Sequence, residues 1–326
     1  MNQLIRVFYR NALNSCCGLI LSVCAVQAAP FAYITNQLDD AVAVIDTQTN
    51  TVVKTIQVGS KPAGVAVTAD GSLIYVSNPE SQSISVINGR TLQLVDSKKL
   101  GSGPVGIAID AKGKRVYVAD WYENVVRVLD GKSLRLIKTI KVGKAPAGLV
   151  VSDDGKRVYV SNRDSDSVSI INAKTLKVVV TEKVGHHPFG ITVDRDGKRL
   201  YVANVLSNDV TVLDAQSLKH VATIDVGELP YVVALTASGK RLFVTNQSDD
   251  TVSVIDTESN KVIHTIDVDE TPEGVAIHPD QQHAYVSNWM SGNVSVINMN
   301  DLSIEKTIET GQGSRAFGQF IQRDEP

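Results

Sequence analysis

Large aromatic and cationic side chains stand out in this 326-residue chain because they lie in short turn-rich segments between its apolar runs. Aromatic residues make up only 5% of the chain, and both of its tryptophans lie in such segments. Aromatic rings and arginines are enriched at the centres of binding interfaces. We therefore expect a binding surface with the anchors Trp121, Tyr122, Phe189, Tyr231 and Trp289 and with the polar contacts Lys61, Lys144, Arg163, Arg315, His186 and His187.

His186 and His187 form a tandem histidine pair directly before Pro188. Imidazoles bind zinc, copper or haem iron, and their protonation changes near neutral pH. A metal site needs three or four converging ligands, and neither a cysteine, a His-x-x-x-His spacing nor a carboxylate pair completes one beside these residues. We expect a polar loop pair, and we predict neither a metal site nor a cofactor.

Acidic pairs at Asp39-Asp40 and Asp249-Asp250 are the residues closest to a catalytic carboxylate arrangement. They occupy one loop position where other parts of the chain have polar pairs such as Ser81-Gln82, so we interpret them as turn-forming hydrogen-bond acceptors. The sequence contains no Gly-x-Ser-x-Gly elbow and no phosphate-binding loop. We therefore predict no catalytic residue.

Gly-Lys-Arg turns offer an alternative chemistry, the binding of nucleic-acid phosphates. They recur at residues 113–115, 155–157, 197–199 and 239–241. Acidic residues outnumber Lys and Arg by 35 to 32, aspartates such as Asp153 and Asp196 adjoin the turns, and no aromatic residues interleave with them. Nucleic-acid binding is thus the less favoured interpretation.

A strict repeat must position all of these residues. Segments of the type Tyr-Val-Ser-Asn recur every 42 residues without an insertion, starting at Tyr33, Tyr75, Tyr117, Tyr159, Tyr201, Phe243 and Tyr285. Prolines keep the same register at positions 62, 104, 146, 188, 230 and 272. Val, Ile and Thr recur in short runs, which favours strands. Seven equivalent structural units are expected.

Each unit contains four short strands, named A to D in chain order. In one copy they are expected at residues 106–109, 115–119, 125–129 and 136–142, with tight turns such as Asp154-Gly155 between strands A and B of another copy. Four strands in a period of about 40 residues indicate a propeller. We predict an all-β, seven-bladed β-propeller with four-stranded antiparallel blades.

Alternating strand direction separates the loops into two faces. The A–B and C–D turns lie on one face, here called the A–B face, and the B–C and D–A connections lie on the other, the B–C face. All of the binding candidates fall in connections of the B–C face. His278 and His283 belong to the A–B face, in the sixth A–B loop, so they cannot join His186 and His187.

Both ends of the chain are expected to meet in one blade. The first repeat starts at a strand B with Tyr33, and an A-like segment at residues 316–321 remains after the last strand D. Pairing this segment with the first strands removes an exposed sheet edge. The closing blade should therefore combine N-terminal and C-terminal segments.

The repeated Tyr-Val-Ser/Ala/Thr-Asn segment, followed by Ser-Val-Ile-Asp/Asn and Gly-x-x-Pro-x-Gly, resembles the YVTN family of β-propeller repeats over residues 31–322. The resemblance implies the propeller fold. Proteins with such repeats include periplasmic binding proteins, archaeal surface-layer proteins and relatives of the d1-haem domain, amine dehydrogenase subunits and seven-bladed lactonases. Local departures from the pattern include Val232, Gln281 and Ala316 at glycine positions.

Residues 1–28 differ from the rest of the chain. Arg6 and Arg10 precede an apolar run of about 15 residues, and Val26-Gln27-Ala28 has the small residues of a signal-peptidase site. The apolar run is shorter than the roughly 20 residues that span a bilayer. We expect a signal peptide cleaved after Ala28, a single domain at residues 29–326, a periplasmic or secreted location and no transmembrane anchor. All three cysteines lie in the signal segment.

Taken together, these features predict an exported, monomeric, non-catalytic binding scaffold that recognises a protein or a small ligand with its B–C face. Two alternatives remain open: a periplasmic nucleic-acid-binding propeller that uses the Gly-Lys-Arg rim, and a lactonase-like enzyme or cofactor-binding propeller associated with an oxidoreductase.

Overall fold

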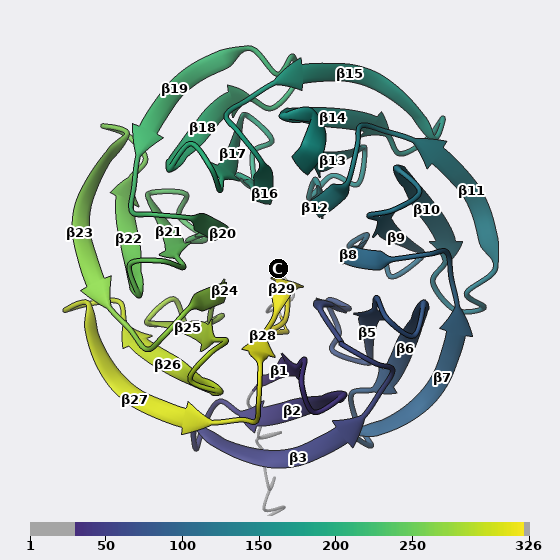
Figure 1. Cartoon of the computed structure of the whole chain (residues 1–326), viewed down its shortest axis with the longest axis horizontal. Helices are drawn as coiled ribbons and strands as arrows, with labels where there is room; N and C mark the ends of the chain where they lie inside the picture. The colour runs from purple at the N-terminus through teal and green to yellow at the C-terminus, as the bar shows by residue number, and fades with distance from the viewer. Residues whose placement is uncertain (1–29, 323–326) are drawn as a thin grey trace, which may run out of the picture.

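The computed structural model describes residues 30–322, which form seven antiparallel blades around a common axis (Figure 1). Strand A of each blade lies nearest the axis and strand D forms the rim, as the order of the paired strands requires. This confirms the predicted all-β, seven-bladed propeller. The predicted signal segment, residues 1–28, lies outside the described residues.

Blades are numbered from the one that contains the first strand. From blade 1 to blade 7, the A strands are β28 (Ser314–Arg315), β4 (Gly64–Val67), β8 (Pro104–Ile109), β12 (Pro146–Val151), β16 (Pro188–Val193), β20 (Pro230–Leu235) and β24 (Pro272–Ile277). The B strands are β1 (Phe31–Asn36), β5 (Leu73–Asn78), β9 (Arg115–Asp120), β13 (Arg157–Asn162), β17 (Arg199–Asn204), β21 (Arg241–Asn246) and β25 (His283–Asn288).

The outer half of each blade repeats in the same way. The C strands are β2 (Ala41–Asp46), β6 (Ser83–Asn88), β10 (Val125–Asp130), β14 (Ser167–Asn172), β18 (Asp209–Asp214), β22 (Thr251–Asp256) and β26 (Asn293–Asn298). The D strands are β3 (Thr51–Gln57), β7 (Gln93–Lys99), β11 (Leu136–Lys141), β15 (Lys177–Lys183), β19 (His220–Asp225), β23 (Lys261–Asp267) and β27 (Ser303–Glu309). A fifth strand, β29 (Phe317–Gln319), joins blade 2, and one 3-10 turn, η1 (Arg163–Ser165), lies in blade 4.

The core lies between adjacent blades. Strands B and C are buried on both of their faces, as in β5, where only Leu73 is partly exposed, because each blade packs against a neighbour on either side. Apolar residues on both faces explain the continuous Val- and Ile-rich runs of the sequence. Strand D is mostly exposed. No helix within residues 30–322 has the length and apolarity needed to cross a bilayer.

Five of the seven inner strands begin at the repeated proline, two residues earlier than the sequence predicts, whereas β4 begins at Gly64 and β28 at Ser314. β8 starts at Pro104, which pairs with Asp120, and a bulge then shifts the register before Ile107 pairs with Val118. A glycine follows within this bulge because the next inner strand comes very close: a Cβ on Gly106 would lie 1.9 Å from the Ala147 carbonyl oxygen. Blade 6 has Val232 at this position, and the blade forms nevertheless.

The C-terminal segment closes the ring by pairing with two blades. Ser314 and Arg315 pair with Asn36 and Thr35 as the inner strand of blade 1, which confirms that both ends of the chain share the closing blade. The expectation of one continuous strand at residues 316–321 is wrong. At Gly318, which has a φ of 99°, the backbone instead follows β4 of blade 2 in parallel as β29.

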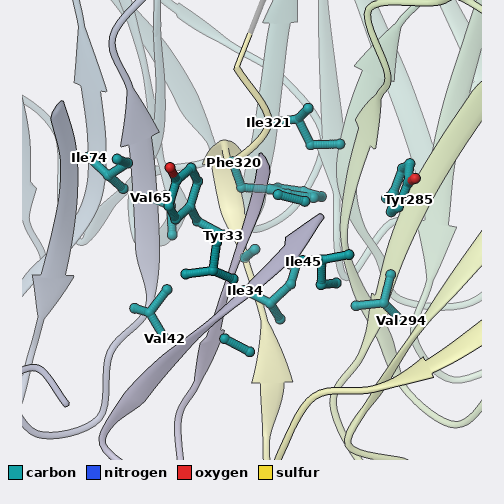
Figure 2. Packing of buried hydrophobic residues seen from close by; sticks show 14 of the residues in the cluster. Tyr33, Ile34, Val42, Ile45, Val65, Ile74, Tyr285, Val294, Phe320 and Ile321 are labelled. Atoms are coloured by element: carbon teal, nitrogen blue, oxygen red, sulfur yellow. The ribbon is translucent and has the colours of Figure 1, made fainter. Parts of the chain in front are cut away.

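Beyond β29 the chain returns to β1. The Tyr33 N–H donates to the Phe320 carbonyl at 2.9 Å, and Ile321 forms a bridge with Ala32. Figure 2 shows Phe320 between Tyr33 of blade 1 and Tyr285 of blade 7, with Ile321 beside it. The last described residues therefore fill the core at the seam between the first and the last blade.

Candidate binding surface around the propeller axis

One column of the repeat places seven side chains around the axis. Each is the residue that follows the repeated proline, or in blade 1 the serine, at or just before the start of an inner strand. We call them the axial ring: Ala63, Val105, Ala147, Phe189, Tyr231, Glu273 and Arg315. Because inner strands converge on the axis, residues that are 42 positions apart in sequence pack in one apolar cluster. Five members are apolar or aromatic, and two are oppositely charged.

Aromatic rings from four blades pack together at this ring. Phe189 stacks on Tyr231 with ring centroids 4.1 Å apart, and Phe317 of β29 meets Phe189 edge-on at 5.2 Å. Trp121, in the B–C loop of blade 3, lies 6.3 Å from Phe189. Such offset and edge-on arrangements are the favoured geometries of aromatic pairs. Four rings thus form one aromatic cluster over the axis, on the B–C face.

A buried ion pair adjoins the aromatic cluster. Arg315 donates from Nε to Glu273 Oε2 at 2.6 Å and from Nη2 to the Tyr231 hydroxyl oxygen at 3.3 Å. Gln247 donates to the other carboxylate oxygen of Glu273 at 3.0 Å. The Arg315 guanidinium also lies over the Phe317 ring, 4.8 Å from its centroid, so it is held by charge, hydrogen bonds and a cation–π contact.

Burial perturbs the protonation of this network. Loss of solvent raises the pKa of Glu273, against the opposing effects of Arg315 and Gln247. It also raises the pKa of the Tyr231 phenol, and the Glu273 carboxylate adds to this effect. Burial alone would lower the pKa of Arg315, but Glu273 raises it, so the guanidinium remains charged. The axial ring therefore contains one permanently charged guanidinium, that of Arg315, and its counter-ion Glu273 is buried beside it.

The sequence analysis assigned Phe189, Tyr231 and Arg315 to loops, and this is wrong. All three lie in inner strands, and Phe189 is fully packed in the core. β16 and β20 start at the proline, so Phe189 and Tyr231 already lie within the strand, in the bulge where the register shifts, and they face the axis. Arg315 pairs with Thr35 in β28. Two further members of the site, Glu273 and Phe317, were not among the expected binding residues. Glu273 could have been found from its position, because it lies 42 residues after Tyr231 and 84 after Phe189 in the repeat.

Arg163 links the aromatic cluster to the surface. Its guanidinium lies 5.3 Å from the centroid of the Trp121 ring and pairs with Asp164 at 2.7 Å. The backbone N–H of Trp121 donates to the Gly103 carbonyl, which fixes the loop. Trp121 and Arg163 come from blades 3 and 4, and both remain partly exposed. Together they form a stacked aromatic–cation pair beside the axis.

The other two aromatic anchors lie apart from this cluster. Tyr122 is among the most exposed large side chains, and its ring covers Gly103. Trp289 is partly buried and donates from Nε1 to Gln37 Oε1 at 3.1 Å, which joins the B–C loops of blades 7 and 1. Trp289 therefore has a contact within the protein.

The remaining predicted polar contacts lie in D–A loops held by neighbouring B–C loops. The N–H groups of His187, Lys61 and Lys144 donate to Asp166, Asp40 and Ser165, at 2.7–2.9 Å. His186 Nδ1 lies 3.2 Å from Asp166 Oδ2. The His187 N–H, with the His186 ring, lowers the pKa of Asp166. Asp166 thus holds the histidine pair as part of the loop structure.

The acidic pairs are confirmed as hydrogen-bond acceptors, although they bridge two loops and do not close a single turn. Asp40 accepts from the Lys61 N–H and Asp250 from the Thr271 N–H, both at 2.8 Å. Asp249 and Asp39 accept from residues 228 and 312 at 2.7 Å. Each pair therefore fastens the connection to the next inner strand.

Exposed apolar side chains mark the B–C face. The structure has fourteen large exposed apolar residues within residues 30–322, and ten of them lie on the rim strands. The other four are between 49% and 71% exposed and share one position of the B–C loop in blades 1, 3, 5 and 7. We call them the apolar tips: Leu38, Tyr122, Leu206 and Met290.

On the A–B face, the Gly-Lys-Arg turns are occupied by contacts within the fold. Arg115, Arg199 and Arg241 each donate from the guanidinium to a carbonyl of the next blade. Lys156 and Lys198 pair with aspartates of their own turns at 3.0 and 3.1 Å. The Ser152 hydroxyl, assisted by Lys156, lowers the pKa of Asp154 to about 2, so this aspartate stays charged. A hollow of about 340 Å³ lies nearby between blades 5 and 6.

The sequence matches the model of the YNCE-like beta-propeller family at residues 66–157 and 149–237, which together span more than half of the chain. The chain belongs to the YNCE-like beta-propeller family. The YVTN-type repeat seen in the sequence agrees with this membership. No curated protein sequence matches the chain.

Solved structures share the fold of this YNCE-like propeller. Hydrazine synthase of Kuenenia stuttgartiensis has a TM-score of 0.75 at 24% identity and covers 82% of this chain and 92% of its own. A functionally unknown protein of Desulfotomaculum acetoxidans has a TM-score of 0.76 at 17% identity, with coverages of 90% and 99%. The dihydro-heme d1 dehydrogenase NirN, solved in complex with DHE, has a TM-score of 0.68 at 14% identity, with coverages of 87% and 74%. These identities show a common fold alone.

Proposed function

We propose that this propeller is a non-catalytic recognition protein that binds a protein partner on its B–C face. The observation that carries the proposal is the set of apolar tips, which occupy one loop position in four of the seven blades and remain exposed. At the same position, blades 2, 4 and 6 have Glu80, Asp164 and Ser248. Because the fold forms with polar residues there, it does not need an apolar one.

The aromatic cluster supports the same surface from its centre. Trp121 and Arg163 are partly exposed and stack on each other. Trp121 also packs against Phe189, which in turn contacts Tyr231 and Phe317. Binding interfaces combine central anchors of this type with contacts spread around them. Apolar tips distributed over four blades suit a broad protein surface better than a small molecule, which needs a concave pocket.

Nucleic-acid binding at the Gly-Lys-Arg rim has weaker support. Three of its four arginines donate a guanidinium N–H to a backbone carbonyl of the next blade, and two of its lysines form ion pairs with aspartates. Phosphate binding would have to compete with both kinds of contact. We therefore direct the experiment that follows at the B–C face.

Replacing the apolar tips tests the proposal directly. A photo-reactive phenylalanine analogue at position 122 should cross-link the partner, which mass spectrometry then identifies. In the triple variant L38S/L206S/M290S we expect an affinity loss of about 2 kcal/mol or more, roughly 30-fold in Kd, because interface anchors cost this much when truncated. The thermal midpoint should stay within a few degrees, since exposed side chains contribute little to stability.

A matched control replaces three apolar residues of similar exposure on the rim strands. The triple variant V53S/V95S/V179S removes side chains of similar exposure from strands β3, β7 and β15 and should keep full affinity. Equal losses in the two triple variants would count against the B–C face. The double variant W121A/W289A is a poorer test, because both rings make contacts within the protein.

Export from the cytoplasm is the second part of the proposal, and it is supported by the sequence of residues 1–28. The mature protein, acting as a monomer, would then begin at Ala29. Amino-terminal sequencing of the protein from a periplasmic or culture-supernatant fraction tests this, and a chain that retains Arg6 and Arg10 there would contradict cleavage.

A further inference from the structure

A group of potential metal ligands lies on the A–B face of blade 7, the face opposite to the candidate binding surface. His278, Asp280 and His283 occupy the turn between β24 and β25, and one ligand atom from each lies within 4.8 Å of the other two. Their side chains are 12%, 30% and 27% exposed. The two histidines are partly buried, and hydrogen bonds within the turn and to Glu305 hold the three groups in place.

The hairpin brings the two imidazoles together. The His278 N–H donates to the His283 carbonyl at 2.9 Å, which closes the turn. Residues that face each other across an antiparallel pair point their side chains to the same side. The His278 and His283 ring centroids lie 6.3 Å apart as a result. A spacing of five residues thus becomes one site.

Asp280 completes the group with one oxygen while its other oxygen holds the turn. Its Oδ1 accepts the N–H groups of Gln282 and His283 at 2.7 and 3.1 Å. Its Oδ2 lies 3.0 Å from His278 Nδ1 and 2.6 Å from His283 Nδ1. The Asp280 N–H points at His278 Nδ1 at 3.2 Å, which favours the unprotonated form of that nitrogen.

The outward nitrogens of both imidazoles have acceptors. His283 Nε2 lies 3.0 Å from Glu305 Oε2, and His278 Nε2 lies 3.0 Å from Thr47 Oγ1. Metal-binding histidines almost always donate their second ring N–H to a carboxylate or another oxygen, which directs the first nitrogen to the metal. In the tautomer in which Nε2–H donates from both rings, both Nδ1 lone pairs face Asp280 Oδ2, and a cation bound among these three atoms would stabilise the arrangement.

The site is specific to blade 7. The turn position of His278 is held by Thr68, Asp110, Ser152, Asp194 and Thr236 in blades 2 to 6, and that of His283 by Leu73, Arg115, Arg157, Arg199 and Arg241. Arg115, Arg199 and Arg241 each donate to a carbonyl of the next blade. In blade 7 the Tyr285 hydroxyl contacts the equivalent Thr47 carbonyl at 3.4 Å. His283 is therefore free of the structural contact that its column usually makes.

We propose that His278 Nδ1, Asp280 Oδ2 and His283 Nδ1 bind a divalent transition-metal ion such as Zn²⁺, with Glu305 and Thr47 orienting the two imidazoles. Two imidazoles and one carboxylate suit zinc, copper or nickel and not the all-oxygen sites that Ca²⁺ and Mg²⁺ prefer. Ligand atoms placed tetrahedrally at about 2.0–2.2 Å from zinc lie about 3.3–3.6 Å from one another. The Asp280 Oδ2–Nδ1 distances of 3.0 and 2.6 Å would therefore have to open by about 0.3–1.0 Å, which side-chain rotation can supply. A water molecule would complete the tetrahedron.

Titration of the full chain, purified without an affinity tag, with Zn²⁺ tests the site. A competing chromogenic chelator should report one ion per chain, and Co²⁺ should give the visible absorption of a tetrahedral N/O site. The variant D280N keeps the turn acceptor Oδ1 and loses the ligand oxygen. We expect it to weaken Zn²⁺ binding by more than about 100-fold, and E305Q to weaken it by about 10-fold, as outer partners of metal sites do. An excess of Mg²⁺ should leave Zn²⁺ binding unchanged.

Two matched controls separate this site from non-specific binding. D154N makes the same change in the equivalent turn of blade 4, where Ser152 and Arg157 stand in place of the histidines. H186A/H187A removes the tandem pair of the B–C face. Both should bind Zn²⁺ like the unchanged protein. Unaltered Zn²⁺ binding in a folded D280N variant, or its loss in H186A/H187A, would overturn the proposal, as would a wild-type chain that binds no Zn²⁺.

Discussion

Removal of residues 314–326 is expected to destabilise the protein by more than about 5 kcal/mol, which is comparable with the whole free energy of unfolding of a typical domain. The deletion removes the inner strand of blade 1 and the strand that joins blade 2. It also exposes the core that Phe320 and Ile321 cover, and it leaves β1 as an open edge. Thermal unfolding followed by circular dichroism measures the effect.

A shorter deletion and a point variant sharpen this test. Deletion of residues 323–326 alone keeps every closing contact described above and should leave the midpoint unchanged. F320A removes one fully buried ring and should cost about 3–5 kcal/mol, a fall in Tm of roughly 6–15 °C. A 314–326 deletion that melts like the full chain would contradict closure by the C-terminal segment.

E273A is expected to cost about 3–5 kcal/mol, because it leaves the Arg315 guanidinium beside the aromatic cluster without its counter-charge. The double variant E273L/R315M should recover most of this loss, since a buried ion pair replaced by apolar side chains of similar volume is often neutral. Chemical denaturation of the two variants and the unchanged protein gives the comparison. A harmless E273A substitution would show that the pair is not desolvated.

The single variant R315M gives the same network a pH dependence. Burial already raises the pKa of Glu273, and loss of Arg315 removes the main influence that lowers it. A carboxyl whose pKa is higher in the folded than in the unfolded state destabilises the fold as pH rises through that interval. R315M should therefore be most destabilised at neutral pH and approach the unchanged protein below about pH 4. A constant deficit across this range would contradict the assignment.

Most of the fold was predictable because its determinants are local and occur seven times. Each blade is encoded by short apolar runs and by turn residues such as Gly155, so the repeat alone indicated number, order and pairing of the strands. The exception is the segment after Arg315. Its path depends on Gly318 and on pairing with β4, some 250 residues away, and nothing near Gly318 in the sequence indicates that partner.

The site was less predictable. The sequence indicated which residues lie near the loops of the B–C face, but it did not indicate which way their side chains point. Phe189 and Tyr231 were selected, but as loop tips, since the bulge that follows the proline is set by contact with the next inner strand. The four apolar tips share one column, and only Tyr122 among them was chosen. The ligand count for a metal was made at His186 and His187, whereas hairpin pairing brings His278 and His283 together.

The axial ring also has a consequence for how such a protein diversifies. In blades 2 to 7 one 42-residue unit carries both an axial-ring residue and the residue at the loop position of the apolar tips, whereas Arg315 and Leu38 of blade 1 come from opposite ends of the chain. Exchange of a unit between related chains would transfer an axial residue and a neighbouring tip as a single cassette, while the core columns stay alike. Six interchangeable cassettes would let recognition change by recombination, without the long inserted loops that other scaffolds need for a new specificity.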